Sequence, residues 1–361
     1  MELKDKLQKV CEAFRIEGKF VGYEQIKAGN VNWTYKVTYR RAGGQAKQYI
    51  VQRVNTYAFR KPEQLMHNAD LVTEHIRAKK QGQTALHYHH TQERKTFIYD
   101  EENCFWRLCN FIPSITYSET LDEKILRQTG AAFGEFQMLL SDFPATELYE
   151  TIPNFHNTPK RLETLFADAE KDPCGRASEV REELAYIASV REEAEQLTRM
   201  HEQGRLPIRV THNDTKINNV LFDENTHEAL AIVDLDTVMP GLVGHDFGDD
   251  IRFATNFVTE DCPDWQRAGC DLEKFRQLTE GFLSQVSGML TIEERRSLAL
   301  SVFSITVELA SRFLDDYLVG DLYFNIHYPD HNLVRTRCQL AMAKDVHRKL
   351  PQMQAIIDAC R

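Results

Sequence analysis

The sequence lacks a block of basic residues of the kind that binds a nucleic acid or an anionic membrane. Its 361 residues include 44 lysines and arginines against 54 aspartates and glutamates, a formal net charge of -10 at pH 7. Because polyanions are attracted by a positive surface, we expect neither a nucleic-acid nor a membrane partner. A local basic pocket for a nucleotide remains compatible with this balance.

Targeting and membrane-spanning patterns are also missing. Residues 1–5 do not begin a signal-peptide core, and we find no apolar run close to the roughly 20 residues that cross a bilayer. The eight cysteines form no CxxC pair and have no spaced histidines beside them, which argues against a zinc site. We therefore expect a cytoplasmic protein whose cysteines are reduced.

No internal repeat or low-complexity linker divides the chain, so its organisation is read from hydrophobic periodicity. An apolar stripe at helical spacing opens the sequence. Strand-like runs follow, two of them joined by the glycine-rich turn Arg41-Ala42-Gly43-Gly44. This order favours an antiparallel sheet that carries helices. The expected strands span residues 20–26, 33–39, 48–54, 96–99 and 104–111, and the expected helices span residues 3–14 and 62–80.

From about residue 112 the periodicity becomes helical. We therefore expect an α+β protein with an N-terminal β-rich lobe over residues 1–111 and a helical C-terminal lobe over residues 112–361. Short strands are expected at residues 208–211, 220–222 and 229–233, and helices at residues 121–140, 159–169, 178–203, 245–256, 272–287, 292–318 and 332–350.

A polar loop between these short strands gathers the chemically informative residues. Phosphoryl transfer from Mg-ATP requires a carboxylate beside the acceptor hydroxyl and oxygen ligands for the metal. Asp214 is the candidate base, or else a turn aspartate that caps its own backbone. Asn219 either offers its amide oxygen to Mg²⁺ or closes the loop. Asp234 is the candidate metal carboxylate, and strand alternation puts Asp236 on the same face as a second acid.

Two neighbours of Asp214 have open roles. His212 is a candidate base in its own right, but we favour a scaffold role in which it hydrogen-bonds backbone carbonyls. Lys216 either neutralises charge on a nucleotide phosphate or is an ordinary surface lysine.

The spacing His212-Asn213-Asp214, four residues, Asn219, followed by Ile232-Val233-Asp234, resembles the catalytic motif of the aminoglycoside phosphotransferase and choline kinase superfamily. Within it, the segments at residues 211–216, 234–241 and 331–337 resemble the N-acetylhexosamine 1-kinases, and this likeness runs through nearly the whole chain.

This resemblance implies a protein-kinase-like bilobal fold with ATP in the cleft. It implies that Asp214 is the base and that Asn219 and Asp234 bind Mg²⁺, while Asp246-Phe247-Gly248 resembles a structural acid of the family. The implied reaction transfers the ATP γ-phosphate to the anomeric hydroxyl of N-acetylglucosamine or N-acetylgalactosamine. The alternatives are a kinase for choline, an aminoglycoside or another small alcohol, and a non-catalytic kinase-like module.

The N-terminal lobe departs from the protein-kinase pattern. Its glycine loop has only Gly29, and the adjacent Asn30 is a candidate for nucleotide and sugar binding. The strand position of the usual phosphate-binding lysine reads Gln52-Arg53, of which only one can point into the cleft; Arg53 is the candidate because a guanidinium can hold phosphate. The helix partner of that cation is Asp70 or Glu74, and the backbone of residues 107–111 is expected to bind adenine.

The acceptor site is expected to include Asn30, Asp214, Phe253, Arg312 and Tyr323. Phe253 and Tyr323 either stack on a pyranose ring or fill the core. Arg312 either binds the sugar or forms an ion-pair ladder with the acids four residues before and after it. The expected partner is a small-molecule sugar, and the expected assembly is a monomer or a weak homo-oligomer.

Overall fold

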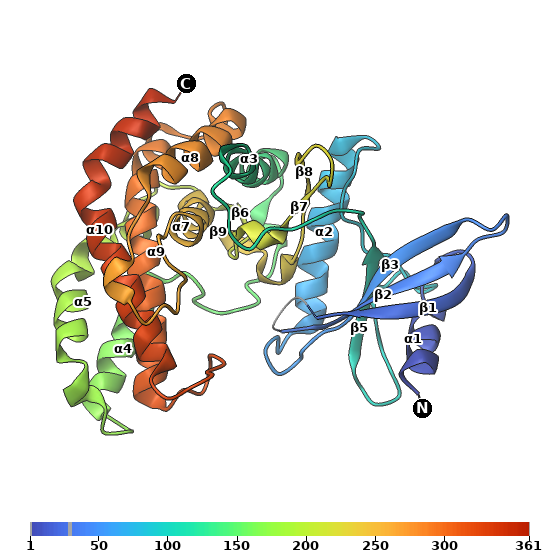
Figure 1. Ribbon diagram of the computed structural model, residues 1–361, viewed down its shortest axis with the longest axis horizontal. Helices are drawn as coiled ribbons and strands as arrows, with labels where there is room; N and C mark the ends of the chain where they lie inside the picture. The colour runs from blue at the N-terminus through green and yellow to red at the C-terminus, as the bar shows by residue number, and fades with distance from the viewer. Residues whose placement is uncertain (1, 28–30, 361) are drawn as a thin grey trace.

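The structure is a computed structural model that describes residues 2–27 and 31–360. An antiparallel sheet forms one end of the molecule, and a larger, mainly helical part forms the other (Figure 1). The α+β class expected from the sequence is confirmed.

The N-terminal sheet has five strands in the order β1-β2-β3-β5-β4, with every neighbouring pair antiparallel. The predicted hairpins are present, and the last two strands join the sheet through β5 beside β3. The strands are β1 (Lys19–Ile26), β2 (Trp33–Arg40), β3 (Ala46–Arg53), β4 (Phe97–Tyr99) and β5 (Phe105–Asn110).

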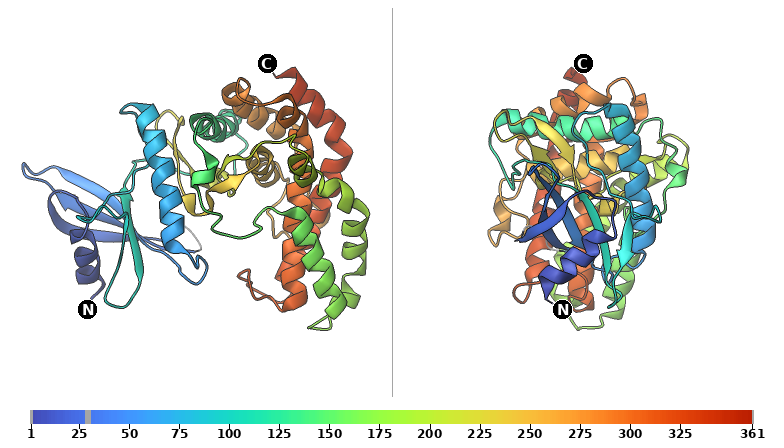
Figure 2. Two further views of the ribbon diagram at one scale, coloured as in Figure 1. Left: turned by 180° about the vertical axis from the view of Figure 1, so that it is seen from behind. Right: turned by 90° about the vertical axis from the view of Figure 1, so that its right-hand side faces the viewer.

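Side chains alternate between the two faces of this sheet, and each face has its own core. Tyr49 and Val51 pack with α1 (Leu3–Glu12) on what we call the outer face, whereas Ile50 packs toward α2 (Pro62–Lys80) on the inner face. The helix α2 lies between the sheet and the helical part of the molecule (Figure 2). The inner face is therefore the one that looks toward the rest of the protein.

The C-terminal part is built around α9, which packs against α4, α5, α7 and α10. The helix expected over residues 178–203 is two helices, and the last helix continues past its expected end. The helices are α3 (Glu123–Leu139), α4 (Thr158–Lys171), α5 (Arg181–Ala194), α6 (Gln196–Glu202), α7 (Val243–Ala254), α8 (Leu272–Val286), α9 (Ile292–Val319) and α10 (His331–Ala359).

The length and composition of α9 correct one expectation from the sequence. Within the described part of the chain, this helix is long and apolar enough to cross a membrane by those two criteria. However, 83% of its apolar window is buried inside the protein, where it forms the centre of the helical core.

Two small antiparallel sheets hold the polar loop. One pairs β6 (Arg209–Thr211) with β9 (Met239–Gly241), a strand that the sequence did not predict. The other pairs β7 (Val220–Phe222) with β8 (Ala229–Ile232). Together they bring the residues after β6 and the residues after β8 to the same place.

The helices α3 and α8 approach closely through glycines. A Cβ atom on Gly130 would lie 2.0 Å from the carbonyl oxygen of Leu278, and one on Gly281 would lie 2.0 Å from that of Arg127. Because this packing leaves no room for a methyl group, it fixes α3. Phe133 and Phe136 of α3 contact His212 of the polar loop, and Gln137 donates to Asp246 of α7.

We predict that Gly281→Ala destabilises the protein although alanine is the better helix former. Forcing a methyl group against the backbone of α3 should cost about 1–3 kcal/mol, more than the roughly 1 kcal/mol of helix propensity gained. Urea unfolding followed by circular dichroism measures this. The control is Gly288→Ala, where a Cβ would meet nothing within 4 Å; equal stabilities of the two variants would contradict the packing argument.

Candidate active site

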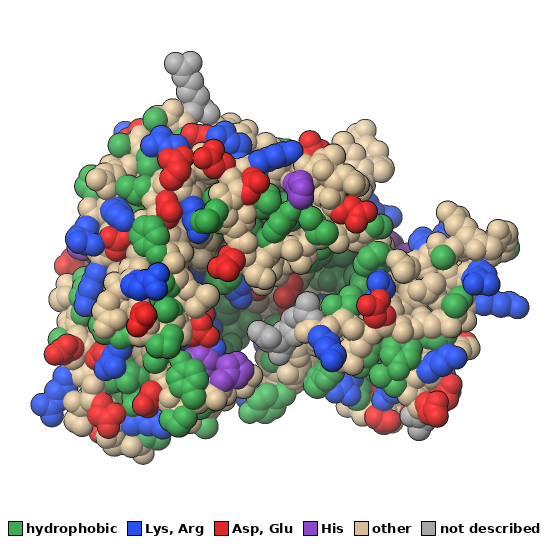
Figure 3. Space-filling view, in the orientation of Figure 1, with side chains coloured by type: hydrophobic (Ala, Val, Ile, Leu, Met, Phe, Trp, Pro, Cys, Tyr) green, Lys and Arg blue, Asp and Glu red, His purple; other side chains and the backbone are tan. Residues whose placement is uncertain are grey.

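The molecule is hollowed between the sheet and the helical part (Figure 3). The strand β6, which the polar loop follows, lies between α7 and α2 (Figure 1). Hydrogen bonds to Asp246 of α7 hold this loop in place. Its carboxylate accepts hydrogen bonds from the backbone amides of His212 (2.9 Å) and Asn213 (2.8 Å) and from Gln137 Nε2 (2.6 Å). Burial raises the pKa of Asp246, and the donors around it oppose that rise. Asp246 therefore has the structural role that we expected rather than a metal-binding one.

His212 is part of the same scaffold. Its ring is fully buried beside Phe133 and Phe136, its Nε2 donates to the carbonyl oxygen of Val233 (3.0 Å), and its Nδ1 accepts from the amide of Asp214 (3.3 Å). One ring nitrogen thus joins the loop to the segment after β8, and the other fixes the backbone of the loop itself. The scaffold role that we favoured for His212 is confirmed.

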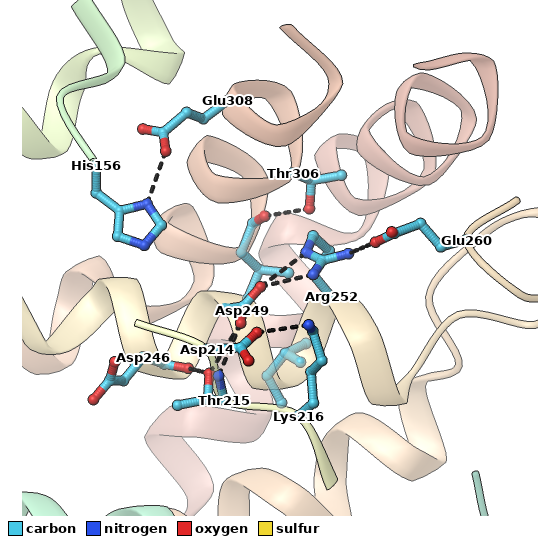
Figure 4. Close-up of polar contacts among 12 residues, drawn as sticks. His156, Asp214, Thr215, Lys216, Asp246, Asp249, Arg252, Glu260, Thr306 and Glu308 are labelled. Carbon is cyan, nitrogen blue, oxygen red and sulfur yellow. Dashed lines mark hydrogen bonds and ion pairs between the residues drawn. The ribbon is translucent and has the colours of Figure 1, made fainter. Parts of the chain in front are cut away.

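The carboxylate of Asp214 faces Lys216 (Figure 4) and also contacts the side chain of Asn219. Lys216 Nζ lies 2.7 Å from its Oδ1, and Asn219 Nδ2 donates to its Oδ2 (3.0 Å) and to its carbonyl oxygen (2.8 Å). Loss of hydration would lower the pKa of Lys216, but the neighbouring carboxylate of Asp214 raises it overall. Lys216 is therefore a charged neighbour of the candidate base. Because both amide hydrogens of Asn219 point to Asp214, its amide oxygen is left for another ligand.

Asp234 lies beside Asn219, as the predicted pairing of their strands requires. Val220 pairs with Ile232, and the amide of Val233 donates to the carbonyl oxygen of Asn219 (2.9 Å). Asp234 itself has a φ of 63°, in the left-handed region that residues other than glycine adopt at a cost and that aspartate tolerates better than most. The sequence thus predicted correctly that the two residues come together.

Asp234 is an exposed residue by its accessible surface, although protein atoms crowd around its carboxylate. Poor hydration and the nearby carboxylates of Asp236 and Asp214 raise its pKa to about 7. A divalent cation would relieve this repulsion, and carboxylate and amide oxygens suit Mg²⁺. Among the described residues, no group of three or more His, Cys, Asp or Glu side chains is arranged to hold a metal. Asn219 and Asp234 could therefore hold Mg²⁺ only together with water or nucleotide phosphates.

Asp236 does not share the face of Asp234, which corrects the expectation from strand alternation. The strand β8 ends at Ile232, and residues 235–237 form a 3-10 turn, so period-two alternation stops before Asp236. Its buried carboxylate instead binds the guanidinium of Arg107 and accepts from Asn32 Nδ2 (2.7 Å). Asp236 is thus bound to the N-terminal sheet.

The candidate nucleotide residues of the sheet are placed differently from our expectation. Asn30 lies outside the described residues. The guanidinium of Arg53 lies 3.7 Å from the ring centroid of Trp33, its partner on β2. Since Arg53 follows the alternation of Tyr49 and Val51, it belongs to the outer face and does not reach the inner face where a phosphate clamp is required.

The inner-face residue of β3 is Gln52, and its neighbour is Arg107 of β5. The two residues are paired directly across the strands, and Arg107 Nε donates to Gln52 Oε1 (2.9 Å). Sequence reasoning assigned Arg107 only a backbone role. The available signal was a single charge inside the apolar run Phe105–Cys109, which a buried strand tolerates only when the charge is paired.

The remaining predictions for the N-terminal lobe also need correction. Asp70 lies 3.2 Å from His90 Nε2, and Glu74 lies 2.9 Å from His87 Nδ1, so both acids of α2 pair with histidines. The amides of residues 110 and 111 donate to the carbonyl oxygens of residues 87 and 48. These two amides, expected to bind adenine, are therefore used within the fold.

The candidate acceptor residues fall into two groups. Arg312 lies over the rings of Phe155 (5.0 Å), Phe324 (5.6 Å) and Tyr323 (5.9 Å), and the Tyr323 side chain is 67% exposed. Phe253 is half-buried and lines a separate cavity of about 470 Å³ together with the 118–121 segment. The structure thus brings Arg312 and Tyr323 together but not Phe253 with them.

The ion-pair ladder considered for Arg312 is not formed. Glu308 turns to His156 Nδ1 (2.8 Å) and Thr158 Oγ1 (2.6 Å) instead. Asp316 accepts from three backbone amides at residues 322–324, at 2.7 to 2.9 Å. Within the parts of the chain that the structure describes, Arg312 has aromatic neighbours and no carboxylate partner.

A hydrogen-bond network connects the polar loop through α7 to Glu260 (Figure 4). Asp249 accepts from the amide of Thr215 (2.9 Å) and from Arg252 Nη2 (2.7 Å), and Arg252 Nη1 donates to Glu260 Oε2 (2.7 Å). Because both ends of its guanidinium are paired, Arg252 fixes the loop rather than offering a free cation.

Known proteins share this architecture and, in part, this sequence. The chain matches the model of the phosphotransferase enzyme family over residues 22–278. A spectinomycin phosphotransferase in complex with ADP and spectinomycin is 13% identical with a TM-score of 0.60, covering 97% of this chain and 99% of that one. A microcompartment-associated aminopropanol kinase is 14% identical with a TM-score of 0.62, covering 97% of this chain and 98% of that one.

An ethanolamine kinase of Plasmodium vivax is 14% identical with a TM-score of 0.54, covering 89% of this chain and 82% of that one. At these identities the likeness concerns the fold, an antiparallel N-terminal sheet followed by a helical C-terminal part. The protein-kinase-like fold implied by the resemblance is therefore confirmed. With the family model matching most of its length, this chain belongs to the phosphotransferase enzyme family.

Proposed function

We propose that this protein is an ATP- and Mg²⁺-dependent kinase that phosphorylates a hydroxyl group of a small molecule, and that the acceptor is the anomeric hydroxyl of an N-acetylhexosamine. The observation that carries the proposal is the assembly of Asp214, Asn219 and Asp234: Asn219 donates to Asp214, and the pairing of β7 with β8 brings Asn219 beside Asp234. The family is one of phosphotransferases. The three compared enzymes are named for small-molecule acceptors.

Each residue of this set has a role that its contacts support. Asp214 orients the acceptor hydroxyl and takes its proton as the bond to phosphorus forms. Asn219 and Asp234 hold Mg²⁺, which when bound supplies charge neutralisation to the nucleotide phosphates. Lys216 pairs with Asp214 and, on turning away from it, can donate to the transferred phosphoryl group. Positioning and charge stabilisation supply most of the catalysis.

The sugar acceptor is supported by the surroundings of Arg312. A guanidinium without a carboxylate partner can donate to the carbonyl oxygen of an acetamido group, and the exposed ring of Tyr323 can stack on a pyranose face. The resemblance to the N-acetylhexosamine 1-kinases includes residues 320–324, the segment that carries Tyr323. Phe253, and Asn30 outside the described residues, remain candidates for sugar binding.

We predict that Asp214→Asn lowers the turnover number by about 100-fold or more, because a neutral amide cannot accept the hydroxyl proton. ADP release in a coupled assay measures this loss. Asp223→Asn, in the β7–β8 turn outside the site, is the matched control and should keep its activity. Near-normal turnover of a folded Asp214→Asn protein would remove Asp214 from the mechanism.

We predict that the metal response depends on Asp234. In the wild-type protein, Mg²⁺ should increase the thermal stabilisation given by ADP, because a ligand that binds only the native state raises its stability. In Asp234→Asn, ADP should stabilise the protein equally with Mg²⁺ and with EDTA. Melting curves by differential scanning fluorimetry test this, and a Mg²⁺ response that survives in the variant would rule out Asp234 as the metal carboxylate.

We predict that N-acetylhexosamines outperform choline and aminoglycosides in an acceptor screen by ADP release. Arg312→Gln should raise the KM for the sugar about tenfold or more, since a hydrogen bond from a charged donor is lost, while the affinity for ADP is unchanged. Arg191→Gln, which removes an arginine over Phe166 elsewhere, is the control. A preference for aminoglycosides, or an unchanged KM in Arg312→Gln, would overturn the sugar assignment.

A further inference from the structure

We propose that Arg107 is the nucleotide phosphate clamp of this protein, a cation supplied by β5 in place of one on β3. This inference rests on the proposed function, because it names a residue of the same nucleotide site. It follows from the placement of the cations of the sheet, from the contacts of the Arg107 guanidinium, and from the carboxylates beside it.

The strand β3 supplies no cation to the inner face near the polar loop. Its inner-face residue at this level is Gln52, which carries no charge, and Arg53 lies on the outer face over Trp33. Arg107 stands directly opposite Gln52 on the neighbouring strand. The side chain of Arg107 therefore lies on the same face of the sheet as that of Gln52, one strand away from the position at which we expected the phosphate-binding cation.

The guanidinium of Arg107 is held at two of its three nitrogens. Nε donates to Gln52 Oε1 (2.9 Å), and Gln52 Nε2 in turn donates to Thr34 Oγ1 (3.1 Å), which fixes the amide. Nη1 binds the carboxylate of Asp236. Nη2 has no hydrogen-bond partner among the residues that the structure describes. A guanidinium fixed in this way has one nitrogen left to donate to a ligand.

The charge of Arg107 lies beside the proposed metal site. Burial would lower its pKa, but the carboxylates of Asp236 and Asp234, with the ring of Tyr88 nearby, raise it overall, so the side chain stays charged. The same cation opposes the repulsion that acts on Asp234. Since phosphates that bind a metal at Asp234 must approach this position, the remaining nitrogen of Arg107 is placed to donate to them.

Arg107 also has an unusual anionic partner. The acids of α2 pair with His90 and His87, so neither holds the cation of the sheet. The carboxylate that binds Arg107 is instead Asp236, two residues after Asp234. Asp236 also accepts a hydrogen bond from Asn32 of the β1–β2 turn. The carboxylate of Asp236 therefore holds both Arg107 and Asn32 of the β1–β2 turn.

Comparison of ligands with and without phosphate separates a clamp from a purely structural ion pair. We expect Arg107→Gln to raise the Kd of Mg-ADP about tenfold or more, because a charge-assisted hydrogen bond is lost, and to leave the Kd of adenosine within about twofold. Arg53→Gln is the matched control and should leave both affinities unchanged. Isothermal titration calorimetry on the full chain measures both constants.

A second pair of variants guards against misfolding, because Arg107→Gln alone leaves the buried carboxylate of Asp236 without its cation. Asp236→Asn and the double variant Arg107→Gln/Asp236→Asn differ only in Arg107. The double variant should bind Mg-ADP about tenfold or more weakly than Asp236→Asn and adenosine equally. Equal ADP affinities in this pair, or a parallel loss for adenosine, would overturn the proposal.

The outcome also distinguishes the clamp from the proposed kinase activity. A wild-type protein that binds ADP through Arg107 but transfers phosphate to no acceptor would refute the activity and leave the clamp. A wild-type protein that binds neither ADP nor ATP would refute both.

Discussion

Negative charge concentrated around one loop is the constraint that the rest of the site depends on. Carboxylates removed from water are costly unless cations or hydrogen-bond donors compensate them. Here the compensation comes from the loop itself and from four other elements, namely β5, the β1–β2 turn, α3 and α7, and it holds these elements together. Asp214 faces Lys216, Asp236 binds Arg107 and Asn32, Asp246 accepts two backbone amides and Gln137, and Asp249 binds Arg252 and the amide of Thr215.

Asp234 is the member of this set without such compensation. It has no ion pair or hydrogen bond to another described residue, and its pKa is raised to about 7 by poor hydration and by its two acidic neighbours. Its left-handed backbone is a second local cost. Both costs are tolerated because the surrounding loop is held rigidly by His212 and Asp246. Among the carboxylates of this loop, Asp234 is therefore the one whose charge is opposed only by the more distant cations of Arg107 and Lys216.

The sequence was most informative where structure depends on short-range pairing. The antiparallel pairing that joins Asn219 to Asp234 crosses only a short turn, and the scaffold role of His212 follows from strands that flank it closely. Prediction failed where alternation was extended beyond a strand, as for Asp236 after the end of β8. It also failed for Arg53, because a one-residue step along β3 moves a side chain to the opposite face.

The remaining failures have a common cause in contacts between distant segments. Arg107 is recognised as a site residue only from the structure, in which β5 pairs with β3 and the Arg107 side chain binds Asp236, 129 residues away in sequence. The spacing around Arg312 fitted a helical ion-pair ladder, yet both acids found better partners elsewhere: Glu308 a histidine and a threonine, Asp316 three backbone amides. Those three amides belong to the segment that carries Tyr323. Asp316, which could have neutralised Arg312, thus positions the backbone of Tyr323, whose exposed ring lies beside that guanidinium. The same hydrogen bonds therefore leave Arg312 without a carboxylate partner among the described residues and shape the surface next to it.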